Sequence, residues 1–182
     1  MNYIIITVPH AACIKDLHKI SDTRAAQAAK LLENYLKSLG RNVILIANHE
    51  TIRSDYDMNK REVRNKHYLL YTEKIISDIL DQGNNISLVL DMHYFSNEYN
   101  YKLVFLYLNK YQEEEIFKYY FEEDHNIGII EDKSNNNIIM LKSNEKNIKS
   151  ILIEVSENDN QFTNNELAFY LYKIAQIINK NF

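Results

Sequence analysis

The chain has 182 residues, of which 46% are hydrophobic, and a formal net charge of −4 at pH 7. We expect residues 1–182 to form one domain, because this length and composition suit a single sizeable core. The acidic balance and the lack of a long Lys/Arg cluster argue against a nucleic-acid partner. The apolar runs are far shorter than the roughly 20 residues that cross a bilayer, and no signal-like start is present, so no membrane association is expected.

Cysteine and glycine usage narrows the class of protein further. Cys13 is the single cysteine, which excludes an internal disulfide. We therefore expect a cytoplasmic location, although a protein without disulfides can also be secreted. Three isolated glycines, Gly40, Gly83 and Gly128, form no phosphate-cradling loop and no dinucleotide fingerprint. Nucleotide-driven chemistry is not expected.

The first part of the chain predicts a strand, a helix and a second strand. Residues 1–10 form an apolar run typical of a buried strand. Ser21 and Asp22 suit a helix N-cap, and Ala and Leu then recur at three-and-four spacing up to Gly40. Residues 42–47 form the second buried strand. This order is that of a parallel crossover.

The remaining chain predicts further strands alternating with helices. Helices are expected at residues 60–82, 111–123 and 164–179. Strands are expected at residues 87–93, 101–108, 127–130, 138–141 and 150–156. The turn-rich segment 134–137 favours a hairpin between the strands at residues 127–130 and 138–141.

Four acidic and imidazole side chains stand at the end of a predicted strand, at a helix start or inside an apolar strand. His10 follows the apolar run of residues 3–9, and His93 ends the run that begins at Leu88. Asp22 opens the first helix, and Glu154 is the one charge within residues 151–155. Polar residues at the ends of such strands face the crevice where open α/β sheets bind ligands.

These four residue types match the needs of a mononuclear zinc hydrolase. His10, Asp22 and His93 supply three ligands and leave a fourth position for water. Glu154 is the candidate general base and acid, because a carboxylate in an apolar strand is costly unless it is paired, bonded or functional. The alternatives are a hydrogen-bonded loop role for each histidine and an ordinary helix cap for Asp22.

Other residues are candidates for supporting roles. Asp91, two residues before His93, is a candidate to orient that ligand by a hydrogen bond, or to bond the following loop. Asn59, Arg61 and Arg64 are candidates to bind a substrate carboxylate or polarise a carbonyl, with solvated helix charges as the alternative. Arg53 is a further candidate to bind a substrate carboxylate, and Cys13 is a candidate to contact the metal.

Several of these motifs, in chain order, resemble the N-formylglutamate amidohydrolases. The matching segments are Val8-Pro9-His10-Ala11-Ala12, Asp22 with Ala25, Asp57-Met58-Asn59-Lys60-Arg61, and Asp91-Met92-His93. The resemblance implies an α/β fold of the zinc carboxypeptidase-like superfamily, in which a three-layer, mixed, mostly parallel sheet is flanked by helices. It also implies Zn²⁺ ligands at His10, Asp22 and His93. In that family Arg directly follows Asn, whereas Lys60 intervenes here.

The chain is also similar to the zinc N-acetylmuramoyl-L-alanine amidases. That pattern comprises a strand-end His, an acidic residue opening a Leu-rich helix, a later strand-end His and a Glu in an apolar strand near the carboxyl end. The residues that can be laid on it are Asp22 through Leu36, Gly40, Val43, Arg61, His93 and Ile151-Leu152-Ile153-Glu154, with His10 at the position of the first His. Those amidases usually have Glu where Asp22 stands, and the glycines around their first His are absent here.

We therefore expect a zinc-dependent amidohydrolase that cleaves a carbon–nitrogen amide bond of an N-acylated, for example N-formylated, amino acid or a related small, peptide-like substrate. The alternative within enzymes is a peptidoglycan amidase or a carboxypeptidase-like zinc hydrolase. A catalytically silent binding module on the same fold is the alternative of another class. The intact set of candidate ligands together with Glu154 argues against that last hypothesis.

Overall fold

The structure is a computed structural model that describes residues 1–9, 23–48, 67–95, 100–107, 113–131, 137–156 and 162–182. The strands in these ranges are β1 (Asn2–Val8), β2 (Asn42–Ala47), β3 (Asn85–Phe95), β4 (Leu103–Tyr107), β5 (Ile127–Glu131) and β6 (Ser150–Ser156). The helices are α1 (Thr23–Ser38), α2 (His67–Asp81), α3 (Glu113–Phe121), α4 (Ile138–Glu145) and α5 (Asn164–Asn181). None of these described helices has the length and apolarity needed to cross a membrane.

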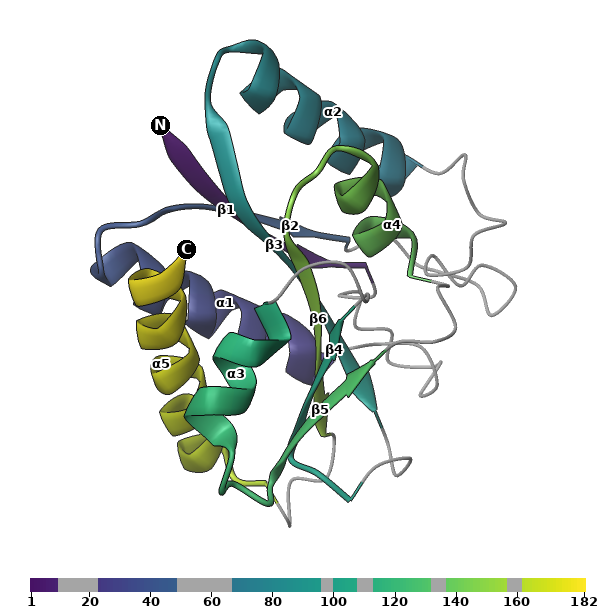
Figure 1. Cartoon of the computed structure of the whole chain (residues 1–182). Coiled ribbons are helices and arrows are strands. Elements are labelled where there is room, and N and C mark those ends of the chain that lie inside the picture. Colours follow the sequence, from purple (N-terminus) through teal and green to yellow (C-terminus); the bar gives the residue numbers. More distant parts are fainter. Residues whose placement is uncertain (10–22, 49–66, 96–99, 108–112, 132–136, 157–161) are drawn as a thin grey trace.

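The described strands form one sheet in the order β2-β1-β3-β6-β4-β5 (Figure 1). β1 pairs in parallel with both β2 and β3, and β3 pairs in parallel with β6. β4 runs antiparallel to β6, while β5 runs parallel to β4. The expected mixed, mostly parallel sheet is therefore confirmed, and the carboxyl ends of β1, β2, β3 and β6 share one edge.

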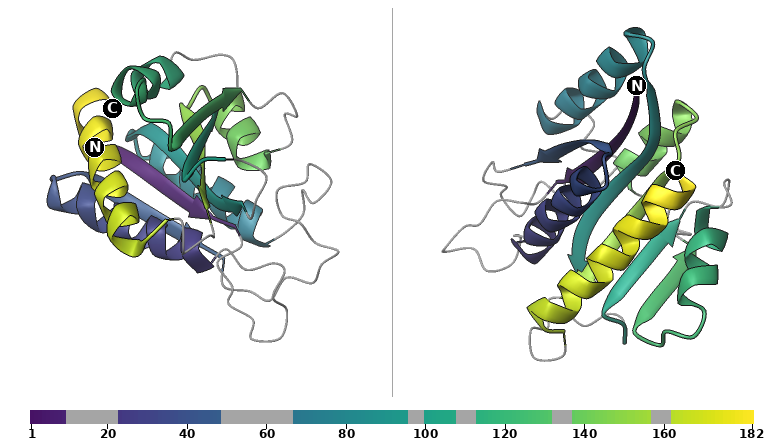
Figure 2. Two further views of the ribbon diagram at one scale, coloured as in Figure 1. Left: turned by 90° about the horizontal axis from the view of Figure 1, so that it is seen from below. Right: turned by 90° about the vertical axis from the view of Figure 1, so that its left-hand side faces the viewer.

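Helices cover both faces of the sheet (Figures 1 and 2). On one face, α1, α3 and α5 bury a large apolar cluster with alternate residues of the strands, among them Ile4, Leu90 and Ile153. On the other face, α2 and α4 pack against residues such as Ile5 and Val89. This alternation follows from the period-two geometry of strands. The result is the three-layer α/β architecture expected from the sequence.

The Ala and Leu stripe of α1 explains how closely this helix packs. Its members are fully buried: Ala25, Ala28, Ala29, Leu32 and Leu36. The helix ends where the Gly40 N–H donates to the Lys37 oxygen at 3.0 Å and the Arg41 N–H donates to the Leu36 oxygen at 3.0 Å. Gly40 has a φ of +81°, which glycine adopts without steric cost. The predicted amphipathic helix and its glycine terminus are confirmed.

The predicted hairpin of residues 127–130 and 138–141 is wrong. Residues 127–131 do form a strand, but β5 pairs with β4, and residues 138–145 form helix α4. The Asn137 side chain accepts a hydrogen bond from the Met140 N–H at 2.9 Å, which caps the first turn of α4. Burial of Ile138, Ile139 and Met140 against the sheet then outweighs the strand propensity of the isoleucines.

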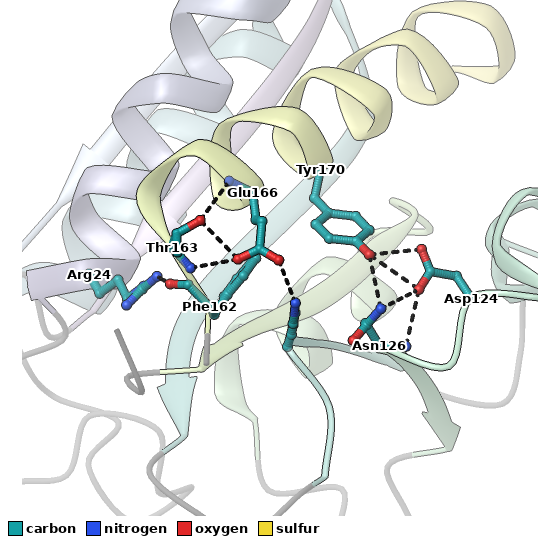
Figure 3. A network of polar contacts seen from close by, with 8 residues as sticks. Arg24, Asp124, Asn126, Phe162, Thr163, Glu166 and Tyr170 are labelled. Carbon is teal, nitrogen blue, oxygen red and sulfur yellow. Dashed lines mark hydrogen bonds and ion pairs between the residues drawn. The ribbon is translucent and has the colours of Figure 1, made fainter. Parts of the chain in front are cut away.

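A polar network anchors the amino end of α5 to the rest of the molecule (Figure 3). Thr163 and Glu166 form a capping box, in which each side chain bonds the backbone N–H of the other residue. Glu166 also pairs with Lys102, just before β4, at 2.6 Å. The Arg24 guanidinium of α1 donates to the Phe162 oxygen. These contacts fix α5 where the chain returns from β6.

Candidate active site at the carboxyl edge of the sheet

The sheet order creates a switch point at the carboxyl end of β1. The chain leaves β1 through α1 to β2 on one side, and it returns through α2 to β3 on the other side of β1. Because α1 and α2 lie on opposite faces, the two connections diverge there. In open α/β sheets this divergence leaves the crevice in which ligands bind.

His93 and Glu154 lie side by side at this edge. They are register partners of the parallel strands β3 and β6, whose spacing is roughly 4.8 Å in such sheets. Both belong to the alternation that faces α2 and α4, because their neighbours Met92 and Ile153 pack into the opposite cluster. His93 is buried, whereas Glu154 is partly exposed. The pair therefore combines a shielded imidazole with a carboxylate that solvent reaches.

Asp91 is the centre of a buried hydrogen-bond cluster around His93. The His93 Nε2 and Asp91 Oδ2 atoms are 2.9 Å apart. The Thr7 hydroxyl of β1 donates to Asp91 Oδ1 at 2.6 Å, and the Asn137 amide donates to Asp91 Oδ2 at 2.7 Å. All four side chains are buried. The carboxylate thus joins β1, β3 and the start of α4.

These contacts set the ionisation of Asp91. Burial alone would raise its pKa, but the charge of His93 and the hydrogen bonds from His93, Thr7 and Asn137 outweigh burial and hold the pKa below its ordinary value. An ionised carboxylate only accepts hydrogen bonds, so the His93 Nε2 atom is assigned as a donor. The charged imidazole has a hydrogen on both ring nitrogens, and when His93 is neutral this tautomer carries its lone pair on Nδ1.

Tyr68, in the first turn of α2, extends this polar region. Its hydroxyl donates to the Ile46 oxygen of β2 at 3.1 Å. Burial, followed by the nearby charge of Asp91, raises the pKa of the Tyr68 phenol well above its usual range. The phenol is therefore a neutral hydrogen-bonding group.

Sequence reasoning did not single out Thr7, Tyr68 or Asn137. Thr7 carried a signal, since it is the one hydroxyl in the buried part of the first apolar run. Asn137 stood at the end of an Asn-rich segment that was interpreted as a turn. Tyr68 is one of 14 tyrosines, and no feature of the sequence distinguishes it from the others.

Most of the other predicted site residues lie outside the described ranges. This is so for His10, Asp22, Asn59, Arg61 and Arg64, and also for Cys13 and Arg53. Described residues flank two of them closely: β1 ends at Val8, two positions before His10, and α1 begins at Thr23, directly after Asp22. Their predicted roles, like those of His93, Glu154 and Asp91, stay predictions.

The described residues fit one part of a zinc site. Among the residues that the structure describes, no group of three or more His, Cys, Asp and Glu side chains could by itself hold a metal ion. The bond between the His93 ring and a buried carboxylate is, however, the arrangement that usually orients a metal-binding histidine. His93 with Asp91 therefore suits one ligand position, with further donors required from elsewhere in the chain.

Solved structures share this fold, although no protein-family model and no curated protein matches the sequence. A gene product from Agrobacterium tumefaciens is similar over 97% of this chain and 88% of its own, with a TM-score of 0.72 and 14% identity. The succinylglutamate desuccinylase from Chromobacterium violaceum is similar over 96% of this chain, with a TM-score of 0.57 and 11% identity. This chain spans only 59% of the desuccinylase.

A third similar structure is the catalytic domain of the N-acetylmuramoyl-L-alanine amidase CwlV from Bacillus (Paenibacillus) polymyxa var. colistinus. The likeness covers 96% of this chain and 93% of that domain, with a TM-score of 0.52 and 12% identity. At such identities the likenesses establish the fold, and they place this chain structurally beside proteins named as amide-cleaving hydrolases.

Proposed function

We propose that this protein is a zinc-dependent amidohydrolase that cleaves the carbon–nitrogen amide bond of an N-acylated amino acid or a related small substrate. The observation that carries the proposal is the pairing of His93 and Glu154 on adjacent parallel strands, with the His93 ring bonded to buried Asp91. The likeness in fold to a desuccinylase and an amidase supports the same chemistry. We further propose that residues 1–182 act as one catalytic domain.

In this proposal His10, Asp22 and His93 hold the metal. Two imidazoles and one carboxylate are a common donor set for catalytic zinc. When bound, zinc supplies a water of near-neutral pKa and polarises the scissile carbonyl. Asp91 keeps the His93 ring in the orientation and tautomer that direct Nδ1 toward the ligand position.

Glu154 moves the proton. It accepts a proton from the attacking water as the new carbon–oxygen bond forms, and it gives that proton to the leaving nitrogen as the carbon–nitrogen bond breaks. The products are a carboxylic acid and an amine, so one water is consumed for each amide cleaved. The partial exposure of Glu154 is consistent with access to substrate and water.

Substrate recognition is proposed for Asn59, Arg61 and Arg64. An arginine can bind a carboxylate through two parallel hydrogen bonds, which suits an amino-acid substrate. The segment that contains these residues joins β2 to α2, and both elements contact the region of Thr7 and Asp91 through Tyr68.

A peptidoglycan amide is the second candidate substrate. The observation that favours it is the likeness to the CwlV catalytic domain, of which this chain covers 93%. Both candidates require the same proton transfer by Glu154, so they differ in the substrate and not in the reaction.

Metal content and amine release test the proposal together. Purified protein is stripped of metal, reloaded with zinc, and assayed for zinc per chain and for amine released from N-formyl, N-acetyl and N-succinyl amino acids and from muropeptides. One tightly bound zinc and zinc-dependent amine release are expected. Failure to bind zinc after reloading would remove the proposal and leave the binding-module alternative, and the preferred amide would separate the two substrates.

A further inference from the structure

Two of the three donors around Asp91 come from distant parts of the chain. Thr7 lies 84 residues before Asp91, and Asn137 lies 46 residues after it. An ionised carboxylate that is fully buried is costly unless its oxygens accept hydrogen bonds. Here Oδ1 accepts from Thr7, while Oδ2 accepts from both His93 and Asn137. Thr7 therefore satisfies Oδ1, and Asn137 shares Oδ2 with His93.

Asn137 is held from both ends of its amide group. Its Oδ1 atom accepts from the Met140 N–H at 2.9 Å, while its Nδ2 atom donates to Asp91 at 2.7 Å. The planar amide cannot rotate without losing both bonds. Met140, fully buried, fixes the same turn of α4 against the apolar cluster that contains Phe95 and Leu152. The amide donor is thus aimed at Asp91 by the packing of α4.

Thr7 approaches Asp91 from the neighbouring strand. The two residues are register partners of β1 and β3, and their side chains lie on the same face of the sheet. The Thr7 hydroxyl has a single hydrogen, and the contact to Asp91 Oδ1 at 2.6 Å is much shorter than that to the Leu90 oxygen at 3.3 Å. The hydrogen is therefore assigned to the carboxylate.

We propose that Thr7 and Asn137 are positioning residues that clamp Asp91, and that the clamped carboxylate fixes the His93 ring as the Nε2–H tautomer with Nδ1 directed to the metal. This inference rests on the proposed zinc site. Loss of either donor leaves Asp91 partly unsatisfied, so that the carboxylate shifts or recruits water and the His93 ring gains freedom. Loss of the bond that orients a metal-binding histidine typically weakens metal binding about 10- to 100-fold, and Thr7 and Asn137 act through that bond.

Paired variants distinguish the loss of a hydrogen bond to Asp91 from a change in side-chain packing. Thr7→Val removes the hydroxyl at nearly constant shape, whereas Thr7→Ser keeps it. Asn137→Ser retains a good helix cap for α4 but is too short to reach Asp91. Ser143→Ala is the matched control, because the buried Ser143 hydroxyl donates to the Ile139 backbone oxygen at 2.8 Å within α4.

Zinc affinity of the folded proteins is measured by competition with a chromophoric chelator. Thr7→Val and Asn137→Ser are expected to bind zinc about 10- to 100-fold more weakly than the unsubstituted protein, with Thr7→Ser and Ser143→Ala close to it. Unchanged affinity in both Thr7→Val and Asn137→Ser would overturn the proposal. Equal weakening in Ser143→Ala would overturn it too, because the loss of any buried hydroxyl would then have the same effect.

The tautomer of His93 is read separately from the ring ¹⁵N chemical shifts of the metal-free protein. The unsubstituted protein is expected to carry hydrogen on Nε2, and the two clamp variants to show a mixture of tautomers. If the unsubstituted protein binds no zinc, the proposed function fails, and the tautomer measurement alone then tests whether Thr7 and Asn137 position Asp91 and His93. A single Nε2–H form in every variant would overturn the proposed positioning role of Thr7 and Asn137. If Thr7→Val does not fold, Asn137→Ser provides the same two readouts.

Discussion

Glu154 lies directly beside His93, as its register partner across the parallel strands β6 and β3. Because side chains alternate along a strand, both project from the face that α2 and α4 cover. A group bound near His93 is therefore within reach of the Glu154 carboxylate.

This relationship predicts that Glu154→Gln loses turnover but keeps its zinc. Glutamine preserves the shape of the side chain and cannot accept the proton. We expect a loss of roughly 10²- to 10⁴-fold in kcat, the usual span for general acid–base residues. Glu131→Gln, at the end of β5, is the matched control and should retain activity. Loss of zinc along with activity would instead make Glu154 a ligand.

Replacement of the two histidines is expected to remove the metal. His10→Ala and His93→Ala each delete one of three protein ligands, so most of the zinc should be lost on dialysis. Metal content per chain is the measurement. His125→Ala, at an exposed position before β5, serves as control. Full occupancy in both ligand variants would refute the assignment.

Asp22 is predicted to bind the metal and not only to cap α1. If it is a ligand, both Asp22→Ala and Asp22→Ser should weaken zinc binding. Serine caps a helix nearly as well as aspartate, so a capping role would leave Asp22→Ser unaffected. Zinc titration of the two variants distinguishes these roles, and normal affinity and activity in Asp22→Ser would assign Asp22 to the cap.

The ion pair of Glu166 with Lys102 predicts an acid-dependent contribution to stability. The hydrogen bond from Lys102, followed by those from Thr163, lowers the pKa of Glu166 from 4.5 to about 2. A lowered folded-state pKa means that the contribution is present above pH 4.5 and disappears as the pH falls through about 2. Urea unfolding of the unsubstituted protein and of Glu166→Gln should give free energies that differ at neutral pH and converge in acid. Lys102→Met should remove most of this pH dependence. A difference between the unsubstituted protein and Glu166→Gln that stays constant from neutral to acid pH would contradict the prediction.

Tyr170 predicts a loss of stability at the alkaline end. Its hydroxyl donates to Asp124 at 2.9 Å (Figure 3). Burial, followed by the bond to Asp124 and its charge, raises the Tyr170 pKa from 10.0 to about 12. A raised folded-state pKa means that the contribution is complete below pH 10 and is lost as the pH rises through about 12.

Tyr170→Phe is therefore expected to lower the free energy of unfolding by about 1.5–3 kcal/mol at neutral pH, the usual contribution of a hydrogen bond to a charged group. It should also remove the alkaline decline. Denaturant unfolding at several pH values checks both effects. Tyr172→Phe, on the exposed side of α5, is the control. Equal effects of the two substitutions would show that the Asp124 bond contributes nothing specific.

Local patterns in the sequence were enough to predict the α/β class and most elements. The apolar runs of β1, β3 and β6 and the stripe of α1 are periodic within short windows, and periodicity reports directly on burial. The same reasoning placed His93 and Glu154 in the carboxyl halves of buried strands, since each breaks or ends an apolar run.

Only the tertiary structure decided which residues meet. Helix α4 replaced a predicted strand because burial on the sheet and the Asn137 cap outweighed local propensity. The antiparallel placement of β4 and the register of His93 with Glu154 depend on pairing between strands far apart in the chain. The bonds from Thr7 and Asn137 to Asp91 likewise span 84 and 46 residues. Contacts over such separations leave no periodic trace in the sequence, because they arise from how whole elements pack.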